Sequence, residues 1–178
     1  MAQMRRIWHV AVLGVIAALL ATPALAAART PRTAHGSFPI DDHFVIEPES
    51  TTCGFPITLD LTGTGSFSAL LDDQGLNEKV HIHIRESGTL SANGIVLRDV
   101  VAENEFTDFF TLTERETGLQ SRDSFLGGGV VIINSGRLIW NFDPNIGETV
   151  GDPLFEAGQH PEVEGDIAGL CAALTPTT

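Results

Sequence analysis

Alternation of apolar and polar residues with a period of two runs through most of the chain after residue 40 and restricts the folds open to it. Residues 57–62 alternate Ile, Leu and Leu with Thr, Asp and Thr, and residues 79–85 alternate Val, Ile and Ile with Lys, His, His and Arg. This pattern is typical of strands that bury one face. Further strands are predicted over residues 66–71, 95–103, 106–113, 119–125, 130–134 and 137–143.

Turn-forming residues separate these segments, and no long helical period interrupts them between residues 40 and 158. Asn93-Gly94 is a strong hairpin signal, because both central positions of a type I′ turn need positive φ. The other predicted turns are 63–66, 72–75, 87–88, 116–118, 127–129, 135–136 and 143–145. About eight short strands joined by hairpins favour an all-β fold, a single antiparallel β-barrel in meander order, because closure removes exposed edges. A β-sandwich is the alternative.

The end of the chain follows a different period. Ile167, Leu170, Cys171 and Leu174 are spaced like one face of a helix, and Asp166 could cap its first turn. The tail therefore predicts a short C-terminal helix. The alternative is a last strand that closes the barrel.

Residues 1–26 have the organisation of a secretory signal peptide. Arg5 and Arg6 precede an apolar run from Val10 to Leu20, and Ala24-Leu25-Ala26 provides small residues for cleavage. The run is too short to span about 30 Å of hydrocarbon as a helix. We therefore expect a secreted, extracellular protein without membrane association after cleavage, with a flexible leader at 27–39 and one β-barrel domain at 40–178.

The charge of the chain is strongly negative, with Lys+Arg 10 against Asp+Glu 23 and a net charge of -13. Loss of Arg5 and Arg6 with the signal makes the mature protein more acidic still. No cluster of Lys or Arg stands out in the sequence. This balance argues against nucleic acid and anionic membranes as partners, because both would be repelled.

Cys53 and Cys171 are the only cysteines and lie near opposite ends of the predicted domain. In an oxidising compartment they are expected to form a disulfide bond. Such a bridge stabilises by up to about 5 kcal/mol in the chain-entropy model. It would tie the terminal helix to the start of the first clear strand.

These features together resemble a group of small secreted actinobacterial proteins of unknown function. The resemblance rests on the alanine-rich export signal, the segment Cys53-Gly54-Phe55-Pro56 before an alternating strand, the hairpins with Asn-Gly and Ser-Gly turns, and Cys171 before Ala172-Ala173-Leu174. It implies an exported, disulfide-tied, β-barrel-like domain, and it transfers no catalytic residue.

Two segments suggest an interior ligand site. In residues 106–112, Asp108 shares a strand face with Phe106, Phe110 and Leu112, and if that face points inward, the pKa of the carboxyl should rise. That would make Asp108 a ligand-orienting or general-acid group, whereas an inverted or bulged strand would leave it in water. In residues 137–143 the larger apolar groups share one face, which predicts an inward direction. The candidate ligand-binding residues are Asp108, Phe110, Leu112, Leu138, Trp140 and Phe142.

His81 and His83 would project from one strand face, as a zinc-binding His-x-His pair does. Lys79 and Arg85 share that face and weaken a metal site electrostatically, and the local sequence lacks a third ligand. We therefore expect an exposed polar face, with no metal and no cofactor. The serine motif of hydrolases and the lysine-containing phosphate loop are also missing from the sequence.

The leading hypothesis is a secreted, non-enzymatic β-barrel protein that binds a small apolar molecule in its interior. One alternative is a small-barrel enzyme of the cyclase or isomerase type that uses an interior carboxylate as acid or base. Another is a surface interaction protein with a filled core. An open apolar interior would favour the binding protein, and convergent ionisable groups would favour the enzyme. A filled interior would favour the interaction protein.

Overall fold

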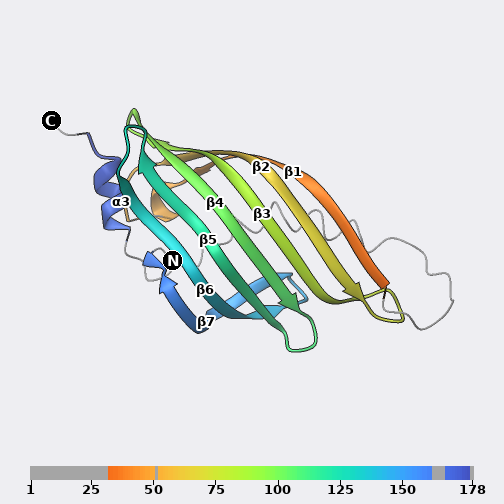
Figure 1. Cartoon of the computed structure of the whole chain (residues 1–178). Coiled ribbons are helices and arrows are strands. Elements are labelled where there is room, and N and C mark those ends of the chain that lie inside the picture. The colour runs from red at the N-terminus through yellow and green to blue at the C-terminus, as the bar shows by residue number, and fades with distance from the viewer. Residues whose placement is uncertain (1–31, 51, 162–166, 177–178) are drawn as a thin grey trace.

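Seven antiparallel strands form one sheet in the computed structural model, which describes residues 32–50, 52–161 and 167–176 (Figure 1). Every strand pairs with its neighbours in sequence, so the sheet order is β1 to β7. This confirms the predicted all-β antiparallel meander. The strands are β1 (Arg32–Ile46), β2 (Ile57–Leu71), β3 (Asn77–Ala92), β4 (Ile95–Asp108), β5 (Thr113–Phe125), β6 (Val130–Asp143) and β7 (Glu148–Gln159).

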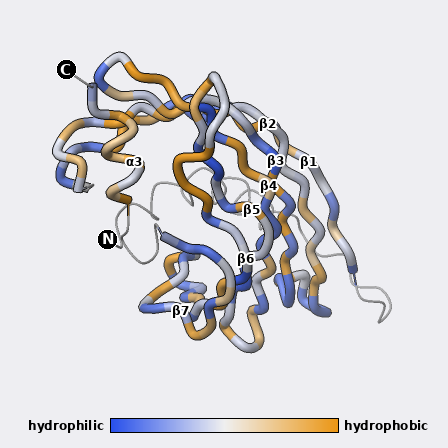
Figure 2. The backbone as a smooth tube through the Cα atoms, turned by 60° about the vertical axis from the view of Figure 1, so that its left-hand side comes forward, coloured by the Kyte–Doolittle hydropathy of each residue, from blue (hydrophilic) through white to orange (hydrophobic). Residues whose placement is uncertain are grey.

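The sheet curls strongly instead of lying flat (Figure 2). Its two ends are β1 and β7, and no pairing joins these two strands in the described part of the chain. The predicted closed barrel is therefore not shown. The strands are also fewer and longer than the sequence analysis predicts, at 12 to 16 residues each.

Glycines explain why the strands are longer than predicted. The glycine-containing segments 63–66, 87–88, 116–118 and 135–136 lie inside β2, β3, β5 and β6, so these four turn predictions are wrong. A Cβ atom on Gly88 would clash with the backbone of Asp60, and one on Gly136 would clash with the backbone of Ala157. Glycine at such positions permits the close approach of strands in a curled sheet. Asn93-Gly94, with φ values of 52° and 80°, does form the predicted turn between β3 and β4.

One face of the sheet, defined by the paired residues Leu59, Leu90 and Leu97 and here called the inner face, carries the apolar core. A first apolar cluster, here called the helix-end cluster, covers the part of the inner face near α3 (Ala168–Ala173). A second cluster lies farther along the strands and contains Ala69, Val80, Ile82, Ile84 and Val101. The buried members of the helix-end cluster are Ile46, Ile57, Leu59, Leu61, Leu90, Ala92, Leu97, Ile132, Ile167, Leu170 and Leu174.

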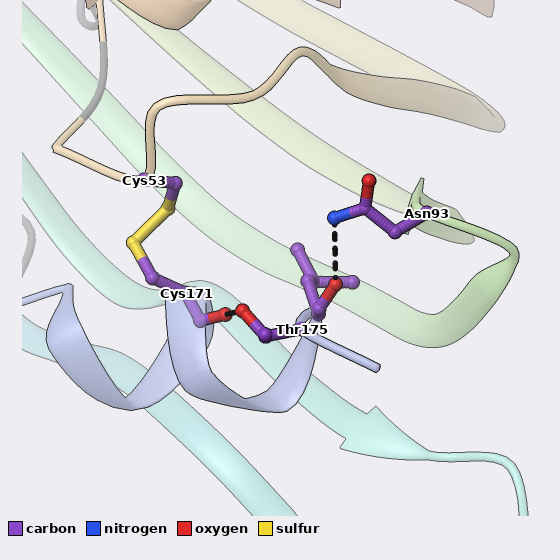
Figure 3. The surroundings of a disulfide bond; sticks show 5 residues. Cys53, Asn93, Cys171 and Thr175 are labelled. Atoms are coloured by element: carbon purple, nitrogen blue, oxygen red, sulfur yellow. Dashed lines mark hydrogen bonds between the residues drawn. A yellow bond between two sulfur atoms is a disulfide. The ribbon is translucent and has the colours of Figure 1, made fainter. Parts of the chain in front are cut away.

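The disulfide bond between Cys53 and Cys171 is present and holds α3 beside the segment that precedes β2 (Figure 3). The Cα atoms of the two cysteines are 5.0 Å apart. Nearby, the Asn93 side-chain amide donates a hydrogen bond to the carbonyl oxygen of Leu174 at 3.0 Å. The predicted short C-terminal helix is confirmed, and its predicted cap, Asp166, lies outside the described residues.

The start of the sheet differs from the sequence prediction. The signal peptide, residues 1–26, lies outside the described residues, but β1 begins at Arg32, within the predicted leader 27–39. Residues 32–39 pair with residues 64–71 of β2, and Phe38 packs against the second cluster. The first strand therefore begins before residue 40, where the sequence predicts the start of the domain, because Gly36 and polar residues obscure the alternation in this strand. No helix of the described chain is both long and apolar enough to cross a membrane.

Candidate functional site

Buried acidic residues occupy the inner face between and beside the two apolar clusters. In strand register, Glu105 of β4 is opposite Glu116 of β5, and Glu103 of β4 is opposite Ile84 of β3. Six carboxyl side chains of the described chain are less than 9 % exposed. They are Glu86, Asp99, Glu103, Glu114, Glu116 and Asp123. We call this set the inner carboxylates.

Hydrogen bonds order part of this polar region. The Thr107 hydroxyl donates to a carboxylate oxygen of Glu114 at 3.0 Å. Asn134 on β6 donates to the Ser121 hydroxyl on β5 at 2.8 Å. Asp99 is hydrogen-bonded to the Asp123 side chain, yet Asp99 Oδ1 is buried and has no partner among the described residues. Its residue is only 1 % exposed, so this oxygen is a free acceptor inside the protein.

The pKa values of two inner carboxylates lie near neutrality. Burial raises the pKa of Glu86 from 4.5 to about 7, and the nearby charges of Asp42 and Asp99 raise it further in the same direction. Burial also raises the pKa of Asp99 from 3.8 to about 6, against the opposing effect of backbone amides from Arg122 and Val100. Both groups can therefore hold or release a proton near neutral pH.

Lysine and arginine side chains of the described chain are almost all on the opposite, outer face. Arg32, at the start of β1, is the one Lys or Arg there whose register places it on the inner face. The other Lys and Arg residues of the described chain are exposed on the outer face, namely Lys79, Arg85, Arg98, Arg115, Arg122 and Arg137. Burying carboxyl groups costs free energy unless they are protonated, hydrogen-bonded or paired with a cation.

Three of the predicted site residues do line the inner face. Leu138, Trp140 and Phe142 are 0 %, 4 % and 8 % exposed, so their predicted inward direction is confirmed. The register places Trp140 opposite Glu114 and Leu138 opposite Glu116. The indole ring therefore lies beside the inner carboxylates, where an apolar wall meets acidic groups.

The other three predicted residues are placed differently. Phe110 is 92 % exposed and Leu112 is 43 % exposed, because β4 ends at Asp108 and both follow in the turn. The alternation that predicts an inward face for them stops where the strand stops. They do not join Leu138, Trp140 and Phe142 on the inner face.

Asp108 has the inverted orientation, which is the alternative to an inward-facing carboxyl group. Lys79 Nζ lies 3.2 Å from its Oδ2, and the backbone amides of Phe110 and Thr111 donate to its Oδ1 at 3.0 and 3.1 Å. The amide of Thr111, followed by that of Phe110 and by Lys79, holds the pKa of Asp108 below its ordinary value. The expected rise in pKa is therefore wrong, and Asp108 serves the turn.

His81 and His83 project from the outer face and share one acceptor. His83 Nδ1 lies 3.0 Å and His81 Nε2 lies 3.3 Å from the side-chain oxygen of Asn104. Arg85 donates to His83 Nε2 at 2.9 Å, which occupies the nitrogen that a metal would need. In the described part of the chain no three His, Cys, Asp or Glu side chains are arranged to hold a metal ion. The expectation of no zinc at this pair stays a prediction.

The substitution Glu86→Gln should change how stability depends on pH. The folded protein keeps the Glu86 proton up to about pH 7, whereas the unfolded chain releases it near 4.5. Protonated Glu86 therefore stabilises the wild-type fold at low pH, and this stabilisation is lost as pH rises from 4.5 to about 7. Because glutamine does not titrate, the free energy of unfolding of Glu86→Gln should rise relative to that of the wild type across this range. Urea unfolding on both sides of this range measures the difference.

Glu47→Gln, at an exposed position directly after β1, is the matched control and should track the wild type. A stability difference between Glu86→Gln and the wild type that does not change with pH would contradict the raised pKa.

No protein-family model, curated protein or solved structure matches this chain. The resemblance inferred from its motifs therefore stays a prediction. The function has to be argued from the geometry of the inner face.

Proposed function

We propose that the mature protein is a secreted binding protein whose inner face takes a small molecule with an apolar part and a cationic group, such as a protonated amine. The observation that carries the proposal is the placement of Trp140, Leu138 and Phe142 directly beside the inner carboxylates. In this proposal the curled sheet surrounds the ligand as a barrel-like wall.

The chemistry of the face favours a cation over the purely apolar ligand that the sequence suggests. A bound ammonium group would place a positive charge beside the buried carboxyl groups, and it would donate a hydrogen bond to Asp99 Oδ1. The indole of Trp140 can attract the same cation over its ring, while the alkyl part packs against Leu138 and Phe142. The buried carboxyl groups lower the stability of the unbound protein, and in the complex they contribute to the free energy of ligand binding.

Acid–base catalysis is the second candidate, and a specific observation favours it. Glu86 and Asp99 have pKa values of about 7 and about 6, which suit a general acid and a general base near neutral pH. An enzyme of the cyclase or isomerase type would use such a pair. The third class, an interaction protein with a filled core, predicts that no small molecule enters.

Titration with three ligands of equal chain length tests the proposal. Decylamine, decanol and decanoate, all kept below their micelle concentrations, differ only in the head group. We expect saturable binding of decylamine with a shift in Trp140 emission, affinity for decanol lower by about tenfold, and no binding of decanoate, because the inner carboxylates repel it.

Variants locate the site. Glu116→Gln should weaken decylamine binding and leave decanol binding unchanged, whereas Glu47→Gln, at an exposed position directly after β1, should leave both unchanged. Equal affinity for amine and alcohol would reject the cationic group and return the proposal to an apolar ligand. Failure of all three ligands to bind would favour the filled core.

A further inference from the structure

The middle of the outer face forms a band without acidic residues. Following the strand register across all seven strands gives three successive rows of outward-facing residues, and none of these positions is Asp or Glu. The chain as a whole has 23 acidic residues. We call these three rows the outer band; they run from His35 to Phe155, from Ser37 to Ala157 and from Pro39 to Gln159.

Positive and hydrogen-bonding groups hold most positions of the outer band, and apolar residues hold the others. Arg85, Arg115 and Arg137 are all exposed, and His81 and His83 lie among them. The remaining positions are rich in hydroxyl side chains on β2, β5 and β6. A chain with a net charge of -13 thus carries a locally positive surface on the face opposite the inner carboxylates.

The three arginines are held in place without carboxylate partners. The guanidinium of Arg115 lies over the ring of Phe106 at 5.0 Å, and that of Arg137 lies over the ring of Phe155 at 4.6 Å. Arg85 donates to His83. Within the described residues none of the three forms a salt bridge. A guanidinium stacked on a ring keeps its N–H edge available for an anion, and less side-chain entropy is lost when the anion binds.

We propose that the outer band binds a linear acidic polysaccharide, whose carboxylate or sulfate groups pair with Arg85, Arg115 and Arg137. The hydroxyl groups of its sugars would bond to neighbouring polar side chains such as Asn104 and Thr117, which lie in the same row as Arg137. This site is on the opposite face from the proposed amine site and does not depend on it.

Charge spacing favours a polysaccharide over nucleic acid. Duplex DNA carries a charge every ~1.7 Å, whereas the three arginines stand on separate strands that are about 4.8 Å or more apart. The net charge of -13 would also repel a dense polyanion more strongly than a polymer with widely spaced charges. Base stacking needs open aromatic rings, and the rings of Phe106 and Phe155 are covered by arginine.

Calorimetric titration with polygalacturonate at low ionic strength tests the proposal. Its methyl-esterified form keeps the sugar backbone without the charge, and single-stranded oligo(dT) provides the nucleic-acid comparison. We expect saturable binding of polygalacturonate that weakens as salt is added, with no binding of the ester. Absence of binding, equal binding of the ester, or tighter binding of oligo(dT) would each overturn the proposal.

A pair of double variants assigns the binding to the band. Arg115→Gln with Arg137→Gln should lower the affinity for polygalacturonate by about tenfold or more, because two charge-assisted contacts are lost. Arg98→Gln with Arg122→Gln removes the same charge from exposed outer-face positions beyond the band and should change the affinity by less than about twofold. Equal losses in both double variants would show that overall charge, and not the band, determines binding. Unchanged Trp140 emission confirms that each variant is folded.

Discussion

Replacing Cys53 and Cys171 together by alanine is expected to lower the free energy of unfolding by about 3–5 kcal/mol. The bridge closes a sequence separation of 118 residues, so its loss greatly increases the freedom of the unfolded chain. It also releases α3, whose Leu170 is 1 % exposed in the helix-end cluster. Because α3 has only six residues, it depends on these contacts to stay helical.

Urea unfolding followed by circular dichroism measures this effect. The reduced wild type should unfold at the same urea concentration as the double alanine variant, since both lack the same constraint. Thr175→Ala is the local control, because it removes one exposed hydrogen bond to the Cys171 carbonyl oxygen and leaves the bridge intact. A double variant as stable as the oxidised wild type would show that the helix-end cluster holds α3 without the disulfide bond.

Trp140→Ala is expected to lower the free energy of unfolding by about 3–5 kcal/mol, because the ring is 4 % exposed and its removal leaves a cavity. The neighbouring Asn141→Ala changes an exposed side chain on the other face and should stay within about 0.5 kcal/mol of the wild type. Chemical unfolding of the two variants and the wild type gives the comparison.

Fluorescence provides an independent measure of the same residue. In a chain that starts at Ala27, Trp140 is the sole tryptophan, since the other, Trp8, is removed. Its emission should be blue-shifted in the folded state and move to longer wavelength on unfolding. Solvent-like emission from the folded protein would contradict the burial of Trp140 on the inner face.

Period-two alternation predicted the class of fold and the inward direction of Leu138, Trp140 and Phe142, because these follow from local geometry. It did not predict the length of the strands. Glycine has two uses, as a turn residue and as a site of close strand approach, and the sequence around Gly88 or Gly136 does not distinguish them. Closure of the sheet is decided by contacts between distant strands, on which a local pattern carries no information.

The inner carboxylates were missed for a different reason. Glu86 continues the phase of Val80, Ile82 and Ile84, and Asp99 lies between Leu97 and Val101 with the same phase. Extending the phase beyond its apolar members would have placed both carboxyl groups on the inner face. Alternation alone does not tell whether such a polar residue is buried, because burial depends on how the sheet curls. Asp108 was misplaced because the inward phase of β4 that Leu97 and Val101 set falls on odd-numbered residues, so Phe106 and Asp108 face outward.

The meander order also bears on how the molecule assembles in time. Each strand finds its partner in the adjacent hairpin, so the sheet can grow one strand at a time over short chain closures. The helix-end cluster is the exception, because Leu170 and Leu174 from the end of the chain pack with Ile46 and Ile57 from its beginning. The two sulfur atoms therefore meet only when the last residues have docked. We therefore expect oxidation of this pair to follow the pairing of the strands and to secure a sheet that is already formed.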